Sequence, residues 1–526
     1  MKSASSADSA ASTSEIFLLD GQTLNIATLW RLANRKGVSL GLAPQAVAAV
    51  RESRDYIEKR MAAGDVMYGV NTGFGAFSSV VISSEQTVEL QKNLIRSHSV
   101  GIGEPFAREE VRAMMILRAN TLARGHSGIR VSVIEKILEF LREDLIPYIP
   151  CQGSVGASGD LAPLSHLALA LMGEGELLGE DRQPVPIAPV LRARKIVALE
   201  LQAKEGLSMI NGCQVMSAVG ALACARAQEL AKLFDLAGAM SLEALRGSRL
   251  AFDALISDSR PHRGEKISAK NLRVILAERS QISDSHRNCH RVQDAYSLRC
   301  MPAVHGAGKD GLRRVVEVLE VECNSSTDNP LVFAKDGKIL SCGNFHGEPV
   351  AMALDFGAIA VASFGSISEC RIAKLINTHM SELPAFLTKM GGLHSGHMIV
   401  QVAAASLVSE NKGLAHPASV DSIPTSAEKE DHVSMGTIAA RKFKKIVDNV
   451  EQILAMEFLS SCQGLDLLQP LESSVAIEAA KLKIREKVPF AKEDRIFAHD
   501  LRAIVELIRN GEILQAVEAQ EIQLEI

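Results

Sequence analysis

The segment with the strongest chemical signal is a glycine-rich stretch at residues 151–169, CQGSVGASGDLAPLSHLAL. Gly153, Gly156 and Gly159 allow backbone conformations that residues with a side chain rarely adopt. An apolar, helix-like run follows the last of these glycines. The segment therefore predicts a tight, specially shaped loop that leads into a helix.

Three interpretations of this loop are open on residue types alone. A glycine-rich loop before a helix can bind a phosphate, but no G-K-[ST] follows. Ser158 could be a nucleophile, but that chemistry favours G-x-S-x-G between a strand and a helix, whereas G-A-S-G follows a helical pattern here. An ordinary tight turn is the third interpretation.

The string from Gly153 to His166 resembles the signature of the aromatic amino acid ammonia-lyases and aminomutases. In that family the Ala-Ser-Gly triplet cyclises and loses water, giving the electrophile 4-methylidene-imidazol-5-one. The resemblance implies that Ala157, Ser158 and Gly159 are catalytic and form this group without an external cofactor. The residue types suit the chemistry. The Gly159 nitrogen is unhindered for attack on the Ala157 carbonyl, and loss of the Ser158 hydroxyl leaves the methylidene.

Two more segments resemble motifs of the same family. MYGVNTGFGAF at 67–77 contains Tyr68, which the resemblance implies is the catalytic base. Because an ordinary tyrosine has a pKa near ~10, this role requires neighbours that stabilise the phenolate. LSMINGCQ at 207–214 contains Asn211, expected to hydrogen-bond the electrophile or the substrate. Cys213 stands where the family usually has threonine.

The remaining substrate-binding candidates come from RVQDAYSLRC at 291–300 and from CGNFHGEP further along the chain. The resemblance implies that Arg299 holds the substrate carboxylate, which its planar guanidinium can bind through two hydrogen bonds. It also implies that Gln293 and Tyr296 line the electrophile and the substrate amine, and that Phe345 packs against the cofactor ring.

The substrate itself is indicated by two short segments. LQKNLIRSHSVGIG at 90–103 contains Ser97-His98, which resembles the pair found in histidine-specific members and in some tyrosine-specific ones. Phenylalanine-specific members have an apolar pair there. In PTSAEKEDHVSMG at 424–436, Glu430 stands where histidine-specific members have glutamate and the others usually have glutamine. A carboxylate at this position could bind an imidazole N–H.

Glu430 also has a purely structural interpretation. Thr425 and Glu428 have the spacing of a capping box, which would place Glu430 in a first helical turn that favours acids. The neighbouring SENKGLAHPASVDS at 409–422 resembles the histidine-specific branch, so we expect Glu430 to be catalytic and His98 to bind substrate. The expected reaction converts L-histidine to trans-urocanate and ammonia, the first step of histidine degradation. A tyrosine ammonia-lyase or 2,3-aminomutase is the alternative, and an inactive structural or binding relative is a distant one.

Two further patterns carry less weight. His394 and His397 have a spacing compatible with a metal site, but no cluster of Cys, Asp or Glu accompanies them, and we expect no metal. They fall where histidine-specific members commonly have Asn and Phe, and could reshape one wall of the substrate pocket. Gly306, Gly308 and Gly311 fit a dinucleotide fingerprint, but they follow no strand and no βαβ unit.

A mainly α fold must position these motifs. Apolar residues recur at three- to four-residue spacing, which predicts amphipathic or buried helices. Predicted helices cover 108–125, 131–146, 214–248, 303–322, 350–376, 396–413, 436–462 and 474–487. Predicted strands are few and short, at 16–19, 24–26 and 331–340, the last with an Asp-Gly turn at 336–337.

The chain is expected to contain two folded parts after a Ser/Ala-rich, disordered tail at 1–14. Residues 15–200 form an N-terminal domain with the Ala-Ser-Gly loop, and a soft boundary falls near 180–200. Residues 201–526 form a central bundle of long helices with further C-terminal helices. The family resemblance, which runs from about residue 18 to 515, implies a fumarase/aspartase-like bundle.

Composition excludes several other classes. The 526 residues contain 57 Lys and Arg against 62 Asp and Glu, so no basic excess favours nucleic acid or an anionic membrane surface. Nine cysteines without a C-x-x-C pair indicate reduced thiols in a cytoplasmic protein. The best candidate for a membrane-spanning segment, 350–368, contains the charged Asp355, so we expect no membrane span.

The family resemblance also implies a quaternary structure. Members form homotetramers whose active sites combine residues from three subunits. The resemblance therefore implies that one site can combine Tyr68 of one chain with Ser158 of another. A folded monomer would then be inactive. The expected partners are therefore a small amino-acid substrate and further copies of this chain.

Overall fold

The structure is a computed structural model that describes residues 16–37, 39–73, 75–77, 79–83, 86–277, 280–287 and 291–526. The predicted tail at 1–14 lies outside the described residues. The chain divides into two compact units, and the boundary expected near residue 200 falls within the first. Unit 1 comprises the chain up to Ala218 with Glu320–Gly347 and Ser422–Ser434; unit 2 comprises Val219–Leu319, Glu348–Asp421 and Met435–Ile526.

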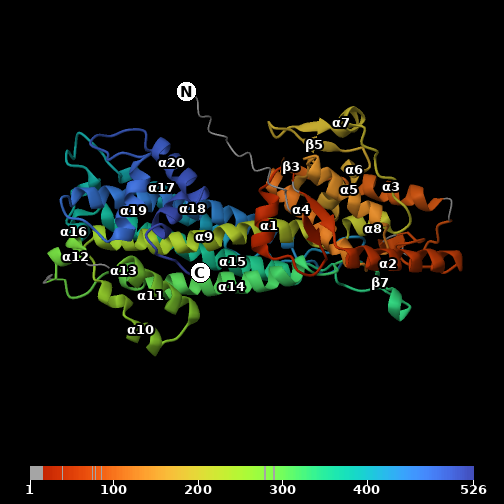
Figure 1. Ribbon diagram of the computed structural model, residues 1–526, viewed down its shortest axis with the longest axis horizontal. Coiled ribbons are helices and arrows are strands. Elements are labelled where there is room, and N and C mark those ends of the chain that lie inside the picture. Colours follow the sequence, from red (N-terminus) through yellow and green to blue (C-terminus); the bar gives the residue numbers. More distant parts are fainter. Residues whose placement is uncertain are drawn as a thin grey trace, which may run out of the picture. The chain divides into compact units, whose positions relative to one another are not determined.

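The fold is mainly helical, as predicted (Figure 1). Each of the eight predicted helices is present, with ends shifted by a few residues. They are α4 (Arg108–Ala123), α5 (Val131–Arg142), α9 (Gln214–Ala244), α14 (Met301–Cys323), α15 (Glu348–Leu375), α17 (Met398–Leu414), α18 (Gly436–Leu467) and α19 (Val475–Arg485).

Strands form four two-stranded sheets in the described part of the chain. The pairs are β1 (Phe17–Leu19) with β2 (Leu40–Leu42), β3 (Ile102–Pro105) with β4 (Pro150–Gln152), β5 (Glu176–Leu178) with β6 (Pro184–Pro186), and β7 (Leu331–Phe333) with β8 (Lys338–Leu340). Only the first pair is parallel. The β7–β8 pair confirms the predicted hairpin, with Gly337 in the left-handed conformation.

The predicted strand at 24–26 is wrong. Asn25 is the N-cap of α1 (Ile26–Ala33), and its side chain accepts a hydrogen bond from the Thr28 amide. An asparagine N-cap stabilises a helix start, and this outweighs the weak β-preference of a three-residue apolar run. The residues instead contribute Leu24 and Ile26 to the core of unit 1.

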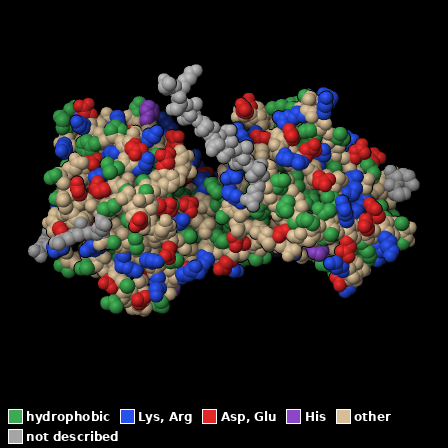
Figure 2. Space-filling model, viewed as in Figure 1, with side chains coloured by type: hydrophobic (Ala, Val, Ile, Leu, Met, Phe, Trp, Pro, Cys, Tyr) green, Lys and Arg blue, Asp and Glu red, His purple; other side chains and the backbone are tan. Residues whose placement is uncertain are grey.

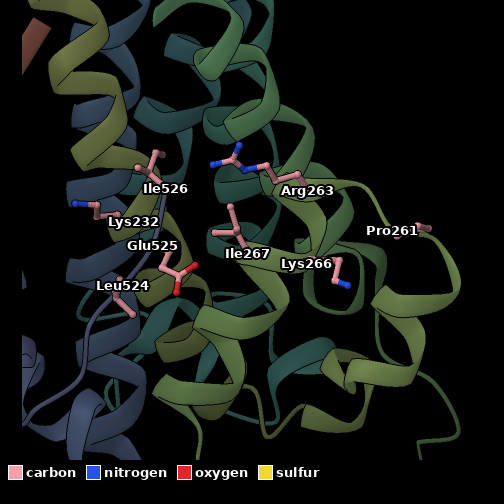
Figure 3. Close-up of a pocket in the computed structure, with 8 residues that line it drawn as sticks. All are labelled: Lys232, Pro261, Arg263, Lys266, Ile267, Leu524, Glu525 and Ile526. Carbon is pink, nitrogen blue, oxygen red and sulfur yellow. The ribbon is translucent and has the colours of Figure 1, made fainter. Parts of the chain in front are cut away.

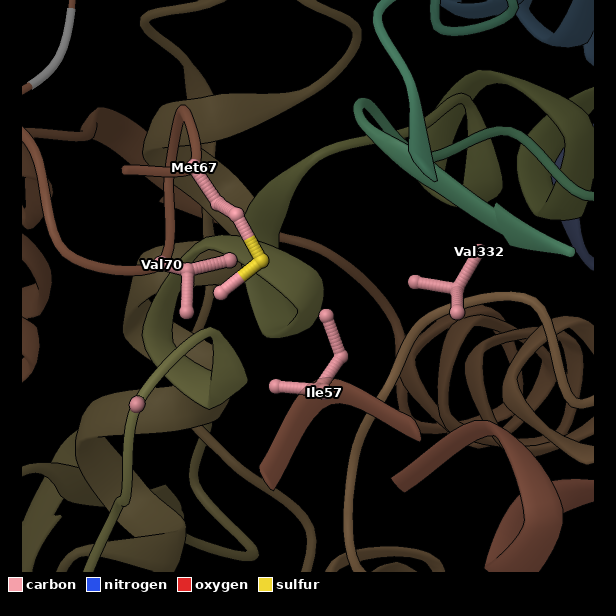
Figure 4. Close-up of a cluster of buried hydrophobic side chains, with 5 residues drawn as sticks. Ile57, Met67, Val70 and Val332 are labelled. Atoms are coloured by element: carbon pink, nitrogen blue, oxygen red, sulfur yellow. The ribbon is translucent and has the colours of Figure 1, made fainter. Parts of the chain in front are cut away.

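Unit 1 surrounds α4, which is buried over most of its length. A cluster of buried apolar side chains, Ile57, Met67, Val70, Ala203 and Val332, anchors the loop that carries Tyr68 (Figure 4). Helix α3 packs against α6 and α8, and these helices frame the pocket described below. The further helices of this unit are α2 (Pro44–Ala62), α3 (Thr87–His98), α6 (Leu161–Leu171), α7 (Ile187–Arg194) and α8 (Glu205–Ile210).

Unit 2 is a helical bundle in which α15 packs along α18, and α17 packs against both. Arg371 of α15 and Glu457 of α18 are both fully buried and form an ion pair. The shorter helices are α10 (Ala254–Ser259), α11 (Arg263–Ile275), α12 (Gln281–Ser285), α13 (Tyr296–Arg299), α16 (Thr378–Ser381), α20 (Phe497–Arg509) and α21 (Glu512–Glu518).

Helix α15 is long and apolar enough to cross a membrane by length and composition alone. Within the structure, 61% of its most apolar 18-residue window is buried, as expected of a core helix in a bundle. Its Asp355 carboxylate accepts a hydrogen bond of 2.7 Å from the Ser419 amide. On the visible surface, acidic and basic side chains are interspersed (Figure 2).

Candidate active site

A pocket of about 1190 Å³ lies within unit 1. It is formed by the ends of α3 and α8, the loop that contains Ser158, and residues 426–432. Seven of the residues that the sequence predicts for the active site line this pocket: Tyr68, His98, Ala157, Ser158, Asn211, Phe345 and Glu430. Tyr68 and Ser158 therefore meet within a single chain.

Gly159 is held in a conformation and a space that only glycine fits. Its φ is +73°, and a Cβ atom would lie 2.3 Å from the Gly212 carbonyl oxygen. The two glycines pair as an isolated parallel β-bridge, and the Asp160 amide donates to the Gly212 oxygen at 2.8 Å. The contact presses the Ala-Ser-Gly triplet against the segment that carries Asn211.

Asp160 fastens this loop to a second helix. It occupies the N-cap position of α6, but its own side chain does not cap that helix. One carboxylate oxygen accepts from the amides of Val215 and Met216 at 3.0 and 2.9 Å, in the first turn of α9. Ser154 donates to the other oxygen at 3.2 Å. The sequence predicted a helix directly after Gly159 but not this long-range partner of Asp160.

Asn211 contacts the triplet directly. Its side-chain amide donates to the Ser158 carbonyl oxygen at 3.0 Å, while its own Oδ1 has no hydrogen-bond partner. The neighbouring Cys213 is buried, and its thiol donates to the Phe345 carbonyl at 3.1 Å. The cysteine that replaces the family's usual threonine thus still supplies a hydrogen-bond donor to the loop of Phe345.

Glu430 lies against Ser158. Its Oε1 accepts a hydrogen bond of 2.7 Å from the Ser158 hydroxyl, and its Oε2 accepts one of 2.8 Å from the Thr425 hydroxyl. Thr425 and Glu430 also pair as an antiparallel bridge. The capping-box alternative is wrong, because the loop between them includes Glu428 at φ +65° and α18 begins only at Gly436.

His98 lines the pocket, and one of its ring nitrogens lies beside Ser97. The Ser97 hydroxyl donates to the Leu94 carbonyl at 3.1 Å and lies 3.0 Å from His98 Nδ1. A neutral imidazole has one N–H and one acceptor nitrogen, so the tautomer with the proton on Nδ1 would leave Nε2 as the acceptor. Burial lowers the pKa of His98, which favours the neutral form.

Within this single chain, the surroundings of Tyr68 favour its neutral phenol over the phenolate. Burial raises the pKa of its phenol, and the negative charge of Glu430 raises it further. A hydrogen bond from the Gly75 backbone acts in the opposite direction, but the pKa remains above its ordinary value. The described residues of this pocket therefore hold Tyr68 in its neutral form.

Gln293, Tyr296 and Arg299 belong to unit 2 and do not line this pocket. The Tyr296 side chain is 72% exposed, and the Arg299 guanidinium lies 4.5 Å from the centre of its ring. Arg299 also donates from Nε to the Asp294 carbonyl at 3.1 Å. The pocket of unit 1 thus lacks the predicted carboxylate clamp.

A second hollow lies within unit 2 and contains none of the predicted residues (Figure 3). Its walls come from Lys232, residues 261–267 and the end of the chain at 524–526. Two of its three basic side chains already have partners, since Lys232 pairs with Glu229 and Lys266 with Asp258. We therefore base the functional argument on the pocket of unit 1.

His394 and His397 also belong to unit 2, away from the lining of that pocket. His394 Nδ1 accepts from the Asp494 amide at 3.3 Å. His397 is buried, with Nδ1 3.2 Å from the Ser460 hydroxyl and its ring edge-on to Phe497. Among the described residues, no group of three or more His, Cys, Asp or Glu side chains could hold a metal ion.

Comparison with known proteins defines the class. Residues 24–486 match the family described as aromatic amino acid lyase, so the chain belongs to this family. It is 50% identical to the histidine ammonia-lyase of Gloeobacter violaceus over 95% of this chain and 97% of that protein.

Two solved structures share the fold. The histidine ammonia-lyase of Trypanosoma cruzi is 44% identical, with a TM-score of 0.90 over 96% of this chain and 95% of that one. A tyrosine aminomutase from Streptomyces globisporus is 37% identical, with a TM-score of 0.92 over 97% of this chain and 100% of that one. The fold is thus common to members named for different reactions.

Proposed function

We propose that this chain is a histidine ammonia-lyase, which converts L-histidine to trans-urocanate and ammonia in the first step of histidine degradation. The observation that carries the proposal is the grouping of His98 and Glu430 with Ser158 in one pocket. The Glu430 carboxylate accepts hydrogen bonds and the His98 ring can donate or accept one, which suits a substrate imidazole with one N–H and one acceptor nitrogen. The similarity to proteins named histidine ammonia-lyase supports the same substrate.

The residues around the triplet fit a 4-methylidene-imidazol-5-one formed from Ala157, Ser158 and Gly159. Gly159 packs against Gly212 without room for a side chain, and Asn211 donates to the Ser158 carbonyl. This group supplies an electrophile to which the substrate amine adds, so that nitrogen becomes a better leaving group. No external cofactor is required.

Each pocket residue then has a role. Tyr68 removes the β-proton, and Glu430 binds the imidazole or assists proton transfer. The free Oδ1 of Asn211 accepts from the substrate amine, and Phe345 packs against the cofactor ring. Because the pKa of Tyr68 is raised within one chain, its phenolate needs a positive charge from outside this pocket.

A homotetramer with shared sites would supply that charge. Arg299, the carboxylate clamp, together with Gln293 and Tyr296, would reach the pocket of another copy. Two observations support this: Tyr296 is exposed, and apolar side chains are exposed on α15 and α17, including Met352, Phe356, Ile359, Ile399 and Val402. The eight described cysteines are all free, which supports a reducing, cytoplasmic location.

The test measures product formation with histidine, tyrosine and phenylalanine in parallel, by the ultraviolet absorbance of the unsaturated acids. We expect urocanate from histidine and little product from the other two. Product from tyrosine alone would overturn the proposal in favour of a tyrosine ammonia-lyase, and conversion of tyrosine to its β-isomer would identify an aminomutase. Activity that survives cyanide and borohydride would exclude the electrophile and with it the proposed chemistry.

A further inference from the structure

A second feature behind the triplet is a buried arginine, Arg118, on α4. Its side chain is fully buried, and Nη1 and Nη2 both donate to the Asn211 carbonyl oxygen at 2.9 and 3.1 Å. Its Nε has no hydrogen-bond partner. Among the described residues, no carboxylate lies within ion-pair distance of this guanidinium. Burial lowers its pKa to about 10, so the group remains charged at neutral pH.

The carboxylates that act on Arg118 through space are engaged elsewhere. Asp328 forms an ion pair of 2.7 Å with Lys204, and both side chains are fully buried. Asp160 accepts hydrogen bonds from the first turn of α9. A buried charge without an ion-pair partner is costly, and an apolar residue of similar length would fill the same space at lower cost. The position of Arg118 therefore needs a reason other than stability.

Asn211 connects this charge to the triplet. Its main-chain carbonyl is held by Arg118, and its side-chain amide donates to the Ser158 carbonyl oxygen at 3.0 Å. Asn211 thus stands between the guanidinium and the Ser158 carbonyl, which would be conjugated to the methylidene. If the triplet forms this group, addition of a nucleophile to it would place negative charge on that oxygen. Donors and positive charge that are already in place lower the cost of this change.

We propose that Arg118 is a positioning residue that holds Asn211 on the Ser158 carbonyl and adds a positive field at the oxygen where negative charge develops. The inference rests on the proposed function, because it assumes that the triplet forms the electrophile. Arg118 touches neither substrate nor triplet, and acts only through Asn211.

The test compares Arg118→Met and Arg118→Lys with a matched control, Arg112→Met. Arg112 is also a buried arginine on α4, but it pairs with Asp144 at 2.7 Å. For each folded variant, peptide mass gives the fraction of chains that have lost two waters at 157–159. The rate of cyanide addition per modified subunit then reports the reactivity of the electrophile without substrate. Steady-state assays with histidine separate kcat from KM.

For Arg118→Met we expect cyanide addition and kcat to fall roughly 10- to 100-fold, with little change in KM. Arg118→Lys, which keeps the charge, should recover part of both rates. Arg112→Met should lose stability but keep the wild-type cyanide rate per modified subunit. A wild-type cyanide rate in Arg118→Met would overturn the inference. If Arg118→Met does not fold, a wild-type cyanide rate and kcat in Arg118→Lys would overturn the proposal that two hydrogen bonds from Arg118 position Asn211.

The two proposals fail in different ways. If the wild-type protein shows no loss of water at 157–159, or forms no urocanate, the proposed function itself fails. If the wild-type protein is modified and active but the Arg118 variants match it per modified subunit, only the role of Arg118 fails.

Discussion

Unit 1 and unit 2 each bury an arginine completely, and they treat it in opposite ways. In unit 2, Arg371 forms ion-pair hydrogen bonds of 2.5 and 2.9 Å with Glu457, whose oxygens also accept from Ser241 and Ser368. In unit 1, Arg118 has only the carbonyl oxygen of Asn211. The buried arginine of unit 2 is paired with a carboxylate, whereas the buried arginine of unit 1 has no carboxylate partner in the described part of the chain and its Nε donates to no acceptor there.

The difference indicates where the protein does chemistry. In the core of unit 2, Asp235 likewise accepts from both His305 and Lys309 at 2.7 Å. Such a network specifies packing and leaves little to offer a ligand. Near the pocket of unit 1, the Asn211 Oδ1 and the Arg118 Nε are buried and unpartnered, and Asn211 lines the pocket itself. Unit 1 keeps polar groups free where a substrate and a developing charge would use them.

The largest effect should come from removing the reactive hydroxyl in unit 1. Ser158→Ala cannot form a methylidene, so we expect histidine turnover to fall at least about 10³-fold, with no loss of two waters by peptide mass. Ser165→Ala is the control, because this buried hydroxyl only donates to the Leu161 carbonyl within α6. Turnover close to wild type in Ser158→Ala would remove the triplet from the chemistry.

Breaking the saturated pair of unit 2 should act on stability instead. Arg371→Met leaves Glu457 buried and unpaired, and we expect a loss of about 3–5 kcal/mol in the free energy of unfolding, measured in urea. The double variant Arg371→Met/Glu457→Met should recover much of this loss. Arg118→Met leaves no carboxylate without its own partner, so it should cost much less. Equal losses in the two arginine variants would contradict the contrast between the units.

A smaller effect should appear in the acid range and comes from unit 2. Burial lowers the pKa of His397 from 6.5 to about 3, so the unfolded chain binds more protons than the folded one between these values. Stability should therefore fall as the pH drops below 6.5, by about 2 kcal/mol at about pH 5. His397→Phe should flatten this part of the pH profile. An unchanged acid slope in this variant would show that other groups dominate it.

The smallest effect should refine the pocket of unit 1. Ser97→Ala removes the hydroxyl that lies 3.0 Å from His98 Nδ1, so the ring loses a contact that orients it in the pocket. We expect KM for histidine to rise several-fold, by about 1 kcal/mol of binding, with a smaller change in kcat. The cyanide rate should not change, because Ser97 makes no contact with the triplet. A change in that rate alone would contradict the assignment of Ser97 to substrate binding.

The sequence by itself determined the helical architecture and the identity of seven residues that line the pocket. Long apolar periodicities are local signals, so α4, α9, α15 and α18 were predicted to within a few residues. The Ala-Ser-Gly loop, Tyr68 and Asn211 were found because their residue types and order match the family. Short segments were predicted less well. The strand expected at 24–26 is absent because Asn25 caps the start of a helix there.

Only the tertiary structure decided how these residues are supported. The partner of Asp160 is more than fifty residues away on α9, and Arg118 reaches Asn211 across a separation of 93 residues. The loop of Glu430 is an irregular turn because the Thr425 hydroxyl and the Ser158 hydroxyl bind its carboxylate, which no local pattern reveals. Burial, the unpaired charge of Arg118 and the raised pKa of Tyr68 all depend on which segments meet, and that depends on packing across the whole unit.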